Sequence, residues 1–267
     1  MTPLARELQR LILQRELQVL FQPILETRAN LALGYEALVR GPIDSPLHGA
    51  SELFETARTT NMLAELEYLC RELAVREFVH HALPGKLFLN VSPLTLTDPH
   101  RPRGETLRIL EREGLSPSRV VIELSEQDPT PDMALLARAT RHYAGMGFEI
   151  AIDDLGAGYS GLRLWSEVRP AYVKIDRHFV ANVHQDRIKR EFVRFIRDIA
   201  RRLGCRVIAE GIEHRGEQEV LQDLGIHALQ GFLLARPAPG STWAAGTLST
   251  PRYQPLAPLP ERWLPAL

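Results

Sequence analysis

The chain has 267 residues, of which 45% are hydrophobic, and it carries 32 Lys and Arg residues against 33 Asp and Glu residues. This length can bury a substantial core, as one large domain or two small ones. A formal net charge of −1 offers no bulk attraction to nucleic acid or to an anionic membrane, so we expect neither as a partner. Any phosphate-bearing ligand must therefore be held by local groups.

The two cysteines, Cys70 and Cys205, lie in apolar segments without C-x-x-C spacing, which favours buried thiols in a reducing compartment over a disulfide. The first 20 residues alternate charged residues with leucine and lack the apolar core of a signal peptide. No apolar run approaches the length needed to cross a bilayer. These features are typical of a cytoplasmic protein, or of the cytoplasmic domain of a larger one.

The first part of the chain predicts a helix and then a pair of strands. Leucines at helical spacing predict an amphipathic helix over residues 4–16. Strand-like runs follow at residues 17–25 and 31–40, and so short a connection cannot hold a crossover helix, so we expect an antiparallel pair. Residues 51–83 are helical in pattern, with a break near residues 59–61.

From residue 86 onward, short apolar strands alternate with helical segments, which predicts a parallel sheet covered by helices. Thr130 followed by Pro131 predicts the start of one of these helices. The expected strands are 86–91, 120–124, 149–153, 172–175, 206–209 and 228–231, and the expected helices are 104–113, 131–146, 160–168, 186–203 and 215–224.

Two opening strands and six later ones make eight, and about 250 residues is the usual length of an eight-stranded α/β barrel. We therefore predict an α/β fold, a TIM-like (β/α)8 barrel with an antiparallel first strand; an open doubly wound sheet is the alternative. The composition turns proline-rich from Pro237. We accordingly assign residues 1–240 to the barrel and residues 241–267 to a tail or linker, with Trp243 and Trp263 as candidates to dock on the barrel.

The helix expected over 186–203 carries an apolar stripe and a basic one. Acidic neighbours, and the lack of aromatic residues on the same face as the arginines, favour a solvated outer face for the arginines over a nucleic-acid patch. The apolar stripe comprises Ile188, Phe192, Phe195, Ile196, Ile199 and Leu203, and the basic one Arg187, Arg190, Arg194, Arg197 and Arg201.

One apolar run ends at two adjacent carboxylates, Asp153 and Asp154, followed by a glycine-rich turn. At the end of a strand both side chains can reach one space, and two adjacent negative charges call for a cation. The alternative is a polar turn in which Asp154 caps the next helix. Residues 156–161 also match G-x-G-x-x-G, with Asp176 placed as in a dinucleotide-binding fingerprint. Two carboxylates just before the turn would, however, repel a pyrophosphate.

Polar residues stand at the carboxyl ends of most predicted strands, and in an α/β barrel these ends converge on the face that holds the active site. Each alone has a structural explanation: Glu123 as a turn cap, Asn90 in an Asx turn, Lys174 paired with Asp176. Their common register is not what packing requires. The residues are Glu36, Arg40, Asn90, Glu123, Asp153, Asp154, Lys174, Asp176, Glu210 and Gln230.

Carboxylates with an amide oxygen, and without thiolates or histidines, indicate a site for a hard cation rather than for zinc or copper. We predict Mg²⁺ or Mn²⁺, as two ions that share Asp153. Two such ions suit phosphodiester hydrolysis, because they clamp the attacking and the leaving oxygens.

Several motifs, in order, resemble the EAL-domain phosphodiesterases of bacterial cyclic di-GMP signalling, over nearly all of residues 5–240. The motifs are Phe21-Gln22-Pro23-Ile24, Tyr35-Glu36-Ala37-Leu38-Val39-Arg40-Gly41, Leu89-Asn90-Val91-Ser92, Ile122-Glu123-Leu124-Ser125-Glu126, Asp153-Asp154, Val173-Lys174-Ile175-Asp176, Ile208-Ala209-Glu210-Gly211-Ile212-Glu213 and Leu229-Gln230-Gly231-Phe232.

The resemblance implies a barrel with an antiparallel first strand and a reaction that opens one phosphodiester of cyclic di-GMP to give linear pGpG. It also implies a homodimer and regulatory or sensor domains in a longer chain. It matches Glu36, Asn90, Glu123 and Asp153 to ligands of one ion, and Asp153, Asp154 and Glu210 to ligands of a second. Lys174, Glu210 and Asp154 are matched to catalytic positions, Gln22, Leu38, Arg40, Glu213 and Gln230 to substrate-binding positions, and Glu126, Gly156 and Gly158 to the control of the loop after Asp154.

The loop departs from the family pattern D-D-F-G-T-G-Y-S-S-L at Leu155, Ala157 and Gly161, but no proposed metal ligand is lost. The alternative is a catalytically silent receptor that binds cyclic di-GMP or a protein partner. Silent members of the family commonly lose one of the strand-end carboxylates. This chain keeps all of them, which favours an enzyme. The dinucleotide fingerprint, by contrast, accounts for only about 30 residues of the chain.

Overall fold

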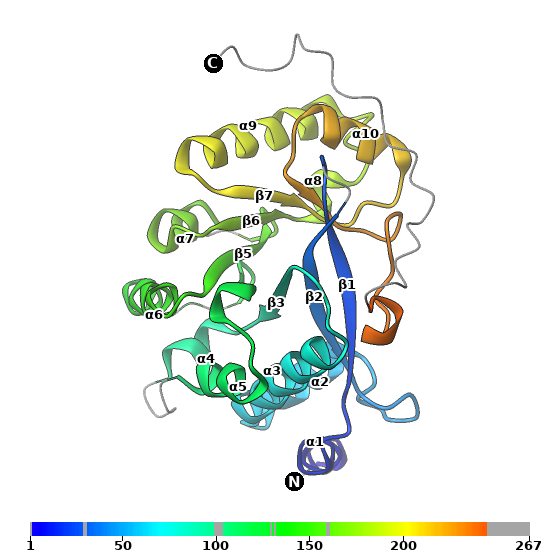
Figure 1. Cartoon of the computed structure of the whole chain (residues 1–267), viewed down its shortest axis with the longest axis vertical. Coiled ribbons are helices and arrows are strands. Elements are labelled where there is room, and N and C mark those ends of the chain that lie inside the picture. The colour runs from blue at the N-terminus through cyan, green and yellow to red at the C-terminus, as the bar shows by residue number, and fades with distance from the viewer. Residues whose placement is uncertain are drawn as a thin grey trace.

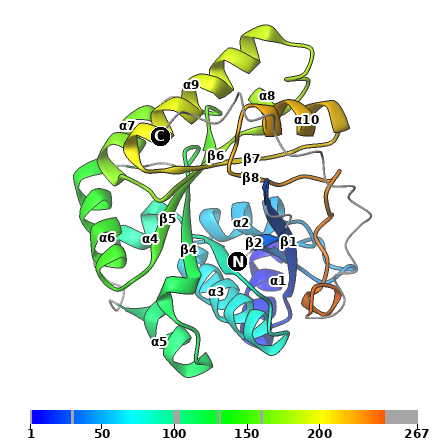
Figure 2. The same ribbon diagram turned by 45° about the horizontal axis from the view of Figure 1, so that its top comes forward.

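The computed structural model describes residues 2–28, 31–98, 104–128, 130, 132–158 and 161–244. Within these residues, the strands close into a barrel in the order of the chain, and helices surround it (Figures 1 and 2). The predicted TIM-like barrel is therefore confirmed, and the open sheet is excluded. The strands are β1 (Gln18–Glu26), β2 (Ala32–Arg40), β3 (Lys86–Asn90), β4 (Val120–Ser125), β5 (Glu149–Leu155), β6 (Tyr172–Ile175), β7 (Arg206–Ala209) and β8 (Ala228–Leu229).

The first strand runs against both of its neighbours, as expected. β1 pairs antiparallel with β2 and with β8, and the remaining neighbours pair in parallel. The connection between β1 and β2 is too short for a crossover, so the chain reverses directly. The register places Gln22 opposite Glu36. The antiparallel strand thus brings an amide side chain beside the glutamate of the family signature.

The helices follow the predicted alternation, and short additional ones lie between them. The break near residues 59–61 is confirmed, because Asn61 adopts a positive φ of 59° between α2 and α3. The helices are α1 (Pro3–Gln14), α2 (Ala50–Thr59), α3 (Leu63–His80), α4 (Pro93–Thr97), α5 (Glu105–Glu113), α6 (Met133–Gly145), α7 (Gly161–Val168), α8 (Arg177–Val180), α9 (Arg187–Leu203) and α10 (Arg215–Asp223), with 3-10 turns at Pro117–Arg119 and Gly240–Thr242.

The predicted start of α6 is wrong. The helix begins at Met133, and its N-cap is Asp132, whose Oδ1 accepts the backbone N–H of Leu135 at 2.9 Å. Thr130 lies before this cap, and Pro131 is outside the described residues. Aspartate is at least as good an N-cap residue as threonine. Because the side chain of Asp132 accepts the N–H of Leu135, the helix begins after Asp132.

The apolar residues of α9 divide between a buried face and an exposed one. The helix buries Val193, Ile196 and Ala200, whereas Phe192 and Phe195 are 49% and 54% exposed. Two apolar stripes lie side by side on this helix, and helical spacing alone cannot say which of them faces the barrel. Figures 1 and 2 show α9 on the outside of the sheet.

The two cysteines and one tryptophan lie as expected. Cys70 and Cys205 are buried free thiols, and burial raises the pKa of each to about 12. Trp243 docks on the barrel, because its indole N–H donates to the carbonyl of Phe21 at 2.8 Å. Trp263 lies outside the described residues. Each helix in the described part of the chain is too short or too polar to cross a bilayer.

Candidate metal centre

The candidate site is one layer of side chains inside the barrel. Directly below it lies an apolar layer to which every strand contributes one residue, namely Ile24, Leu33, Phe88, Val121, Ala151, Tyr172, Ile208 and Ala228. Side chains along a strand return to the same face every second residue. Two positions further toward the mouth therefore bring the next inward residues, which are Gln22, Asn90, Glu123, Asp153, Lys174, Glu210 and Gln230. The barrel thus changes from apolar to polar within one step along its strands.

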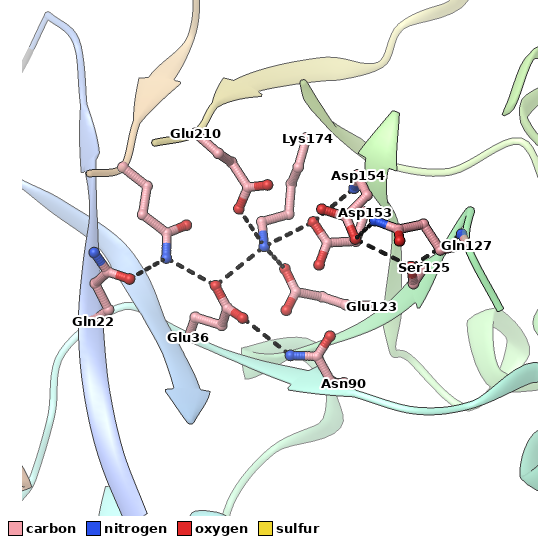
Figure 3. Close-up of polar contacts among 11 residues, drawn as sticks. Gln22, Glu36, Asn90, Glu123, Ser125, Gln127, Asp153, Asp154, Lys174 and Glu210 are labelled. Carbon is pink, nitrogen blue, oxygen red and sulfur yellow. Dashed lines mark hydrogen bonds and ion pairs between the residues drawn. The ribbon is translucent and has the colours of Figure 1, made fainter. Parts of the chain in front are cut away.

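Lys174 lies at the centre of this polar layer and is fully buried. Its Nζ atom is surrounded by carboxylates from four other strands or strand ends, as Figure 3 shows. The distances from Nζ are 2.7 Å to Glu210, 2.8 Å to Glu123, 3.1 Å to Asp153 and 3.2 Å to Glu36. Pairing of Lys174 with Asp176, the structural alternative, is not seen. Asp176 instead caps α8 by accepting the N–H of His178 at 2.8 Å.

Two groups of carboxylates have the spacing of metal ligands. Glu36, Glu123 and Asp153 form one group, and Asp153, Asp154 and Glu210 form the other; within each group the ligand atoms lie within 4.8 Å of one another. Asp153 belongs to both, as expected of a bridging ligand.

The donor set fits hard divalent cations. The candidate metal-ligating atoms are carboxylate oxygens and the side-chain oxygen of Asn90. The Nδ2 atom of Asn90 donates a hydrogen bond to Glu36 at 3.0 Å, and the side-chain oxygen of Asn90 takes no part in that bond. Among the described residues, the buried Oε2 of Glu123 has no hydrogen-bond partner. Such an orphaned oxygen inside a barrel is costly unless a cation meets it.

Asp153 and Asp154 reach the same space because β5 is irregular at this point. Its pairing with β6 shifts register between Ile152 and Leu155, and Asp154 adopts a left-handed backbone with φ of 56°. This turn prevents the alternation that would otherwise send the second carboxylate to the opposite face. The Oδ2 atom of Asp154 accepts hydrogen bonds from Ser125 Oγ at 3.2 Å and from Gln127 Nε2 at 3.1 Å. These two partners are not expected from the sequence, because both contacts depend on the fold of the turn after β4.

Burial and mutual repulsion raise the proton affinity of these groups. Burial, with the charge of Asp153 added, raises the pKa of Asp154 to about 6. Burial likewise raises the pKa values of Glu123 and Glu210 well above the usual range, although Lys174 opposes the rise. For Lys174, burial lowers the pKa, but the surrounding carboxylates outweigh it and hold the pKa well above its ordinary value. The layer therefore has more negative charge than its ammonium can balance.

A chain of amides joins the metal groups to β1 and β8. Gln230 donates to Glu36 at 2.8 Å and to the side-chain oxygen of Gln22 at 3.2 Å. Gln22 in turn donates to the carbonyl of Ala235 at 3.1 Å. These contacts hold the Glu36 carboxylate in a fixed orientation at the edge of the cluster.

The other predicted substrate contacts lie around this core. Leu38 and Asn90 line a cavity of about 610 Å³ that reaches Glu123 and Asp154. Arg40 donates to the carbonyl of Val39 at 2.8 Å, and Glu213 pairs with Arg177 at 2.6 Å. The metal groups do not include Arg40 or Glu213.

The glycine-rich turn after Asp154 is held by Glu126. The two oxygens of Glu126 accept the backbone N–H groups of Gly156 at 2.7 Å and Gly161 at 2.6 Å. A carboxylate therefore already occupies the N–H groups that a dinucleotide fingerprint would offer to a pyrophosphate. This contact excludes the dinucleotide-binding interpretation. A Cβ atom on Gly158 would lie 3.2 Å from Glu126, so the clamp is tightly packed on this side as well.

Comparison with known proteins agrees with this geometry. The family model of the EAL domain matches residues 5–237. The bifunctional diguanylate cyclase/cyclic di-GMP phosphodiesterase MucR of Pseudomonas aeruginosa is 30% identical over 245 residues, which cover 88% of this chain and 35% of MucR. This chain thus spans about a third of that relative's length.

Solved structures share the same barrel. The PaMucR phosphodiesterase in complex with c-di-GMP matches with a TM-score of 0.80 at 28% identity, over 89% of this chain and 98% of that one. BlrP1 of Klebsiella pneumoniae, in a manganese/cyclic di-GMP complex at pH 9.0, matches with a TM-score of 0.77 at 29% identity, over 84% of this chain and 57% of that one. With the family model matched over most of its length, the chain belongs to the EAL domain family.

Proposed function

We propose that this chain is a metal-dependent phosphodiesterase that hydrolyses cyclic di-GMP to linear pGpG. The observation that carries the proposal is the double carboxylate cluster, in which Asp153 serves both groups of ligands inside the mouth of the barrel. Relatives named for cyclic di-GMP hydrolysis and structures solved with c-di-GMP supply the substrate class.

Two Mg²⁺ or Mn²⁺ ions fit the donors of the cluster. Glu36, Asn90, Glu123 and Asp153 would hold one ion, and Asp153, Asp154 and Glu210 the other. Bound there, the ions would supply positive charge for the attacking and leaving oxygens. BlrP1 was solved in a manganese complex and in a calcium complex, each with cyclic di-GMP, so this one related protein is found with either kind of divalent ion.

The side chains around the cluster have distinct roles in this proposal. Lys174 would hold the attacking water or a phosphate oxygen, and Glu210 would take a proton from that water; the 2.7 Å contact between the two side chains supports these roles. Water adds to one phosphorus atom, and the ester oxygen leaves with a proton, which opens the ring. Substrate binding would involve Gln22, Leu38, Arg40, Glu213 and Gln230.

We also propose a homodimer and a regulatory partner domain in the full-length protein. The exposed apolar stripe on α9 supports the dimer, because Ile188, Phe192, Phe195 and Leu203 form a surface that a second copy would cover. The fraction of MucR that the chain spans supports further domains.

The test is incubation of the purified chain with cyclic di-GMP and Mg²⁺ or Mn²⁺, with chromatographic detection of pGpG. Wild type should form pGpG, and a chelator should stop it. Glu36→Ala and Asp153→Asn should abolish turnover at limiting metal, because each removes a ligand. Glu149→Ala is the matched control, since Glu149 begins β5 at the opposite end of the strand and pairs with Lys86. Tight binding of cyclic di-GMP without product would reject the enzyme in favour of the silent receptor.

A further inference from the structure

The position of Asp154 depends on a neighbour that is not itself a candidate ligand. Asp154 has a left-handed backbone, which is costly for a residue with a Cβ atom and persists only when its surroundings enforce it. Among the described residues, Ser125 and Gln127 are the two side chains that donate to Asp154, and both reach its Oδ2 atom. The two donors thus determine how the carboxylate faces Asp153 and Glu210 (Figure 3).

The turn after β4 forms two sets of hydrogen bonds to the turn after β5. Glu126 binds the backbone N–H groups of Gly156 and Gly161, and Gln127, the next residue, binds the side chain of Asp154. The backbone N–H of Gln127 donates to Ser125 Oγ at 3.1 Å, so both donors to Asp154 belong to one hydrogen-bonded turn. The hydrogen bonds to Glu126 fix the backbone of the loop, and the hydrogen bond from Gln127 fixes the carboxylate of Asp154.

An ion pair anchors this turn to the helix across the cavity. Arg58 of α2 contacts Asp128 at 3.1 Å, and Asp128 follows Gln127 directly. Both residues line the cavity that reaches Asp154. A contact chain therefore runs from α2 through Asp128 and Gln127 to Asp154.

We propose that Gln127 is a positioning residue for the second metal position, that its side-chain amide holds Asp154 in the ligand orientation, and that the Arg58–Asp128 pair holds Gln127 in place. This inference rests on the metal centre proposed above. In this proposal Gln127 affects the binding of the ion held by Asp154 but not of the other ion. Among the interactions of the described residues, Gln127 contacts Asp154 but has no contact with the other ion's ligands Glu36, Asn90 and Glu123.

Calorimetric titration of the metal-free full chain with Mn²⁺ tests the proposal without catalysis. Asp154→Asn identifies which binding step depends on Asp154. Gln127→Met keeps the length of the side chain but removes the donor, and should weaken that step by about 10- to 100-fold while the other step stays within about 2-fold. Arg58→Met should weaken the same step by about 2- to 5-fold, since a half-exposed ion pair contributes less. Gln185→Met is the matched control, because Gln185 is also exposed and bonds only to His184 among the described side chains.

Equal Mn²⁺ constants for wild type and Gln127→Met would overturn the proposal, and so would a wild-type titration with a single step. Equal weakening of both steps, with a lower unfolding midpoint, would also overturn it, since that indicates general loosening. A pGpG assay separates the two proposals. Selective weakening in Gln127→Met without any wild-type hydrolysis would support the positioning role and reject the phosphodiesterase, whereas wild-type hydrolysis with unchanged constants would do the reverse.

Discussion

The ammonium of Lys174 lies 2.7 Å from the carboxylate of Glu210, and it contacts the carboxylates of Glu36, Glu123 and Asp153 as well. A buried carboxylate without a cation is strongly unfavourable, so one lysine stabilises most of the cluster in the absence of metal. Its ammonium occupies the same shell of oxygens that divalent ions would enter. Lys174 and the ions are therefore linked through shared ligands.

Replacing Lys174 by methionine should destabilise the metal-free chain by about 3–5 kcal/mol, because several buried carboxylates lose their cation. Saturating Mn²⁺ should restore much of this loss, since the ion binds only the folded cluster. Denaturant unfolding with and without Mn²⁺ measures both effects. Lys86→Met is the control, because Lys86 pairs with a single partly exposed carboxylate, Glu149. A metal-free Lys174→Met chain as stable as wild type would contradict the central role of this ammonium.

Asp154→Asn should stabilise the metal-free chain at pH 8 while abolishing turnover. The pKa of Asp154 is about 6 in the folded chain, above its unfolded value, so its contribution to stability is largest at low pH and is lost as pH rises through 6. Removing the charge should therefore gain about 1–2 kcal/mol at pH 8, after allowance for partial exposure. Asparagine tolerates the left-handed backbone, so no new strain enters.

The pH dependence of unfolding in chelator checks this, as the gain should vanish below pH 4. The gain in stability of Asp154→Asn over wild type should also vanish when Mn²⁺ is present. Mn²⁺ stabilises wild type by binding the folded chain, and it binds the variant only weakly. A variant that is less stable than wild type at pH 8 in chelator would show that the carboxylate is already compensated without metal.

The polar layer of the barrel could be predicted because it follows from backbone geometry. Parallel strands send their carboxyl ends to one face, and the period of two sets which residues point inward. Glu123, Asp153 and Glu210 are therefore expected to lie close together, and all three contact the Nζ atom of Lys174. The ion-pair partners of Lys174 could not be predicted from the sequence. Asp176 is near in the sequence, whereas the four carboxylates that Lys174 contacts are near only in the folded chain.

Other features depend on details that a sequence pattern does not contain. Ser125 and Gln127 contact Asp154 through a turn whose shape is set by tertiary hydrogen bonds. On α9, Phe192 and Val193 are adjacent and both apolar, so the rotation of the helix on the barrel decides which is buried. Phe192 packs on Phe179 at 5.4 Å between ring centres and remains partly exposed.

Removing the carboxylate of Glu126 should lower turnover by about 10- to 100-fold with saturating Mn²⁺. The N–H groups of Gly156 and Gly161 then lose their acceptor, and the turn that carries Asp153 and Asp154 is no longer fixed. Steady-state hydrolysis by Glu126→Ala measures the loss, and Glu111→Ala, in the exposed part of α5, is the control. Wild-type turnover in Glu126→Ala would mean that Ser125 and Gln127 suffice to hold the loop.

Glu67 should make the fold less stable as pH rises from about 4.5 to 7. Burial raises the pKa of Glu67 from 4.5 to about 7, although Arg71, 3.5 Å away, opposes the rise. The folded chain therefore binds a proton in this range that the unfolded chain has released, and stability falls with rising pH. The contribution is up to about 3 kcal/mol.

The measurement is the free energy of unfolding of wild type and Glu67→Gln across this range, at constant ionic strength. The variant cannot titrate, so its stability should rise relative to wild type by up to about 3 kcal/mol between pH 4.5 and pH 7. Its amide oxygen can still accept the N–H of Ser92, which Glu67 binds at 3.3 Å, so the contact to the turn after β3 is retained. Glu219→Gln, on the exposed side of α10, controls for the loss of one negative charge. Parallel pH profiles for wild type and Glu67→Gln would show that Arg71 keeps this carboxylate ionised throughout, and that burial is the weaker of the two effects.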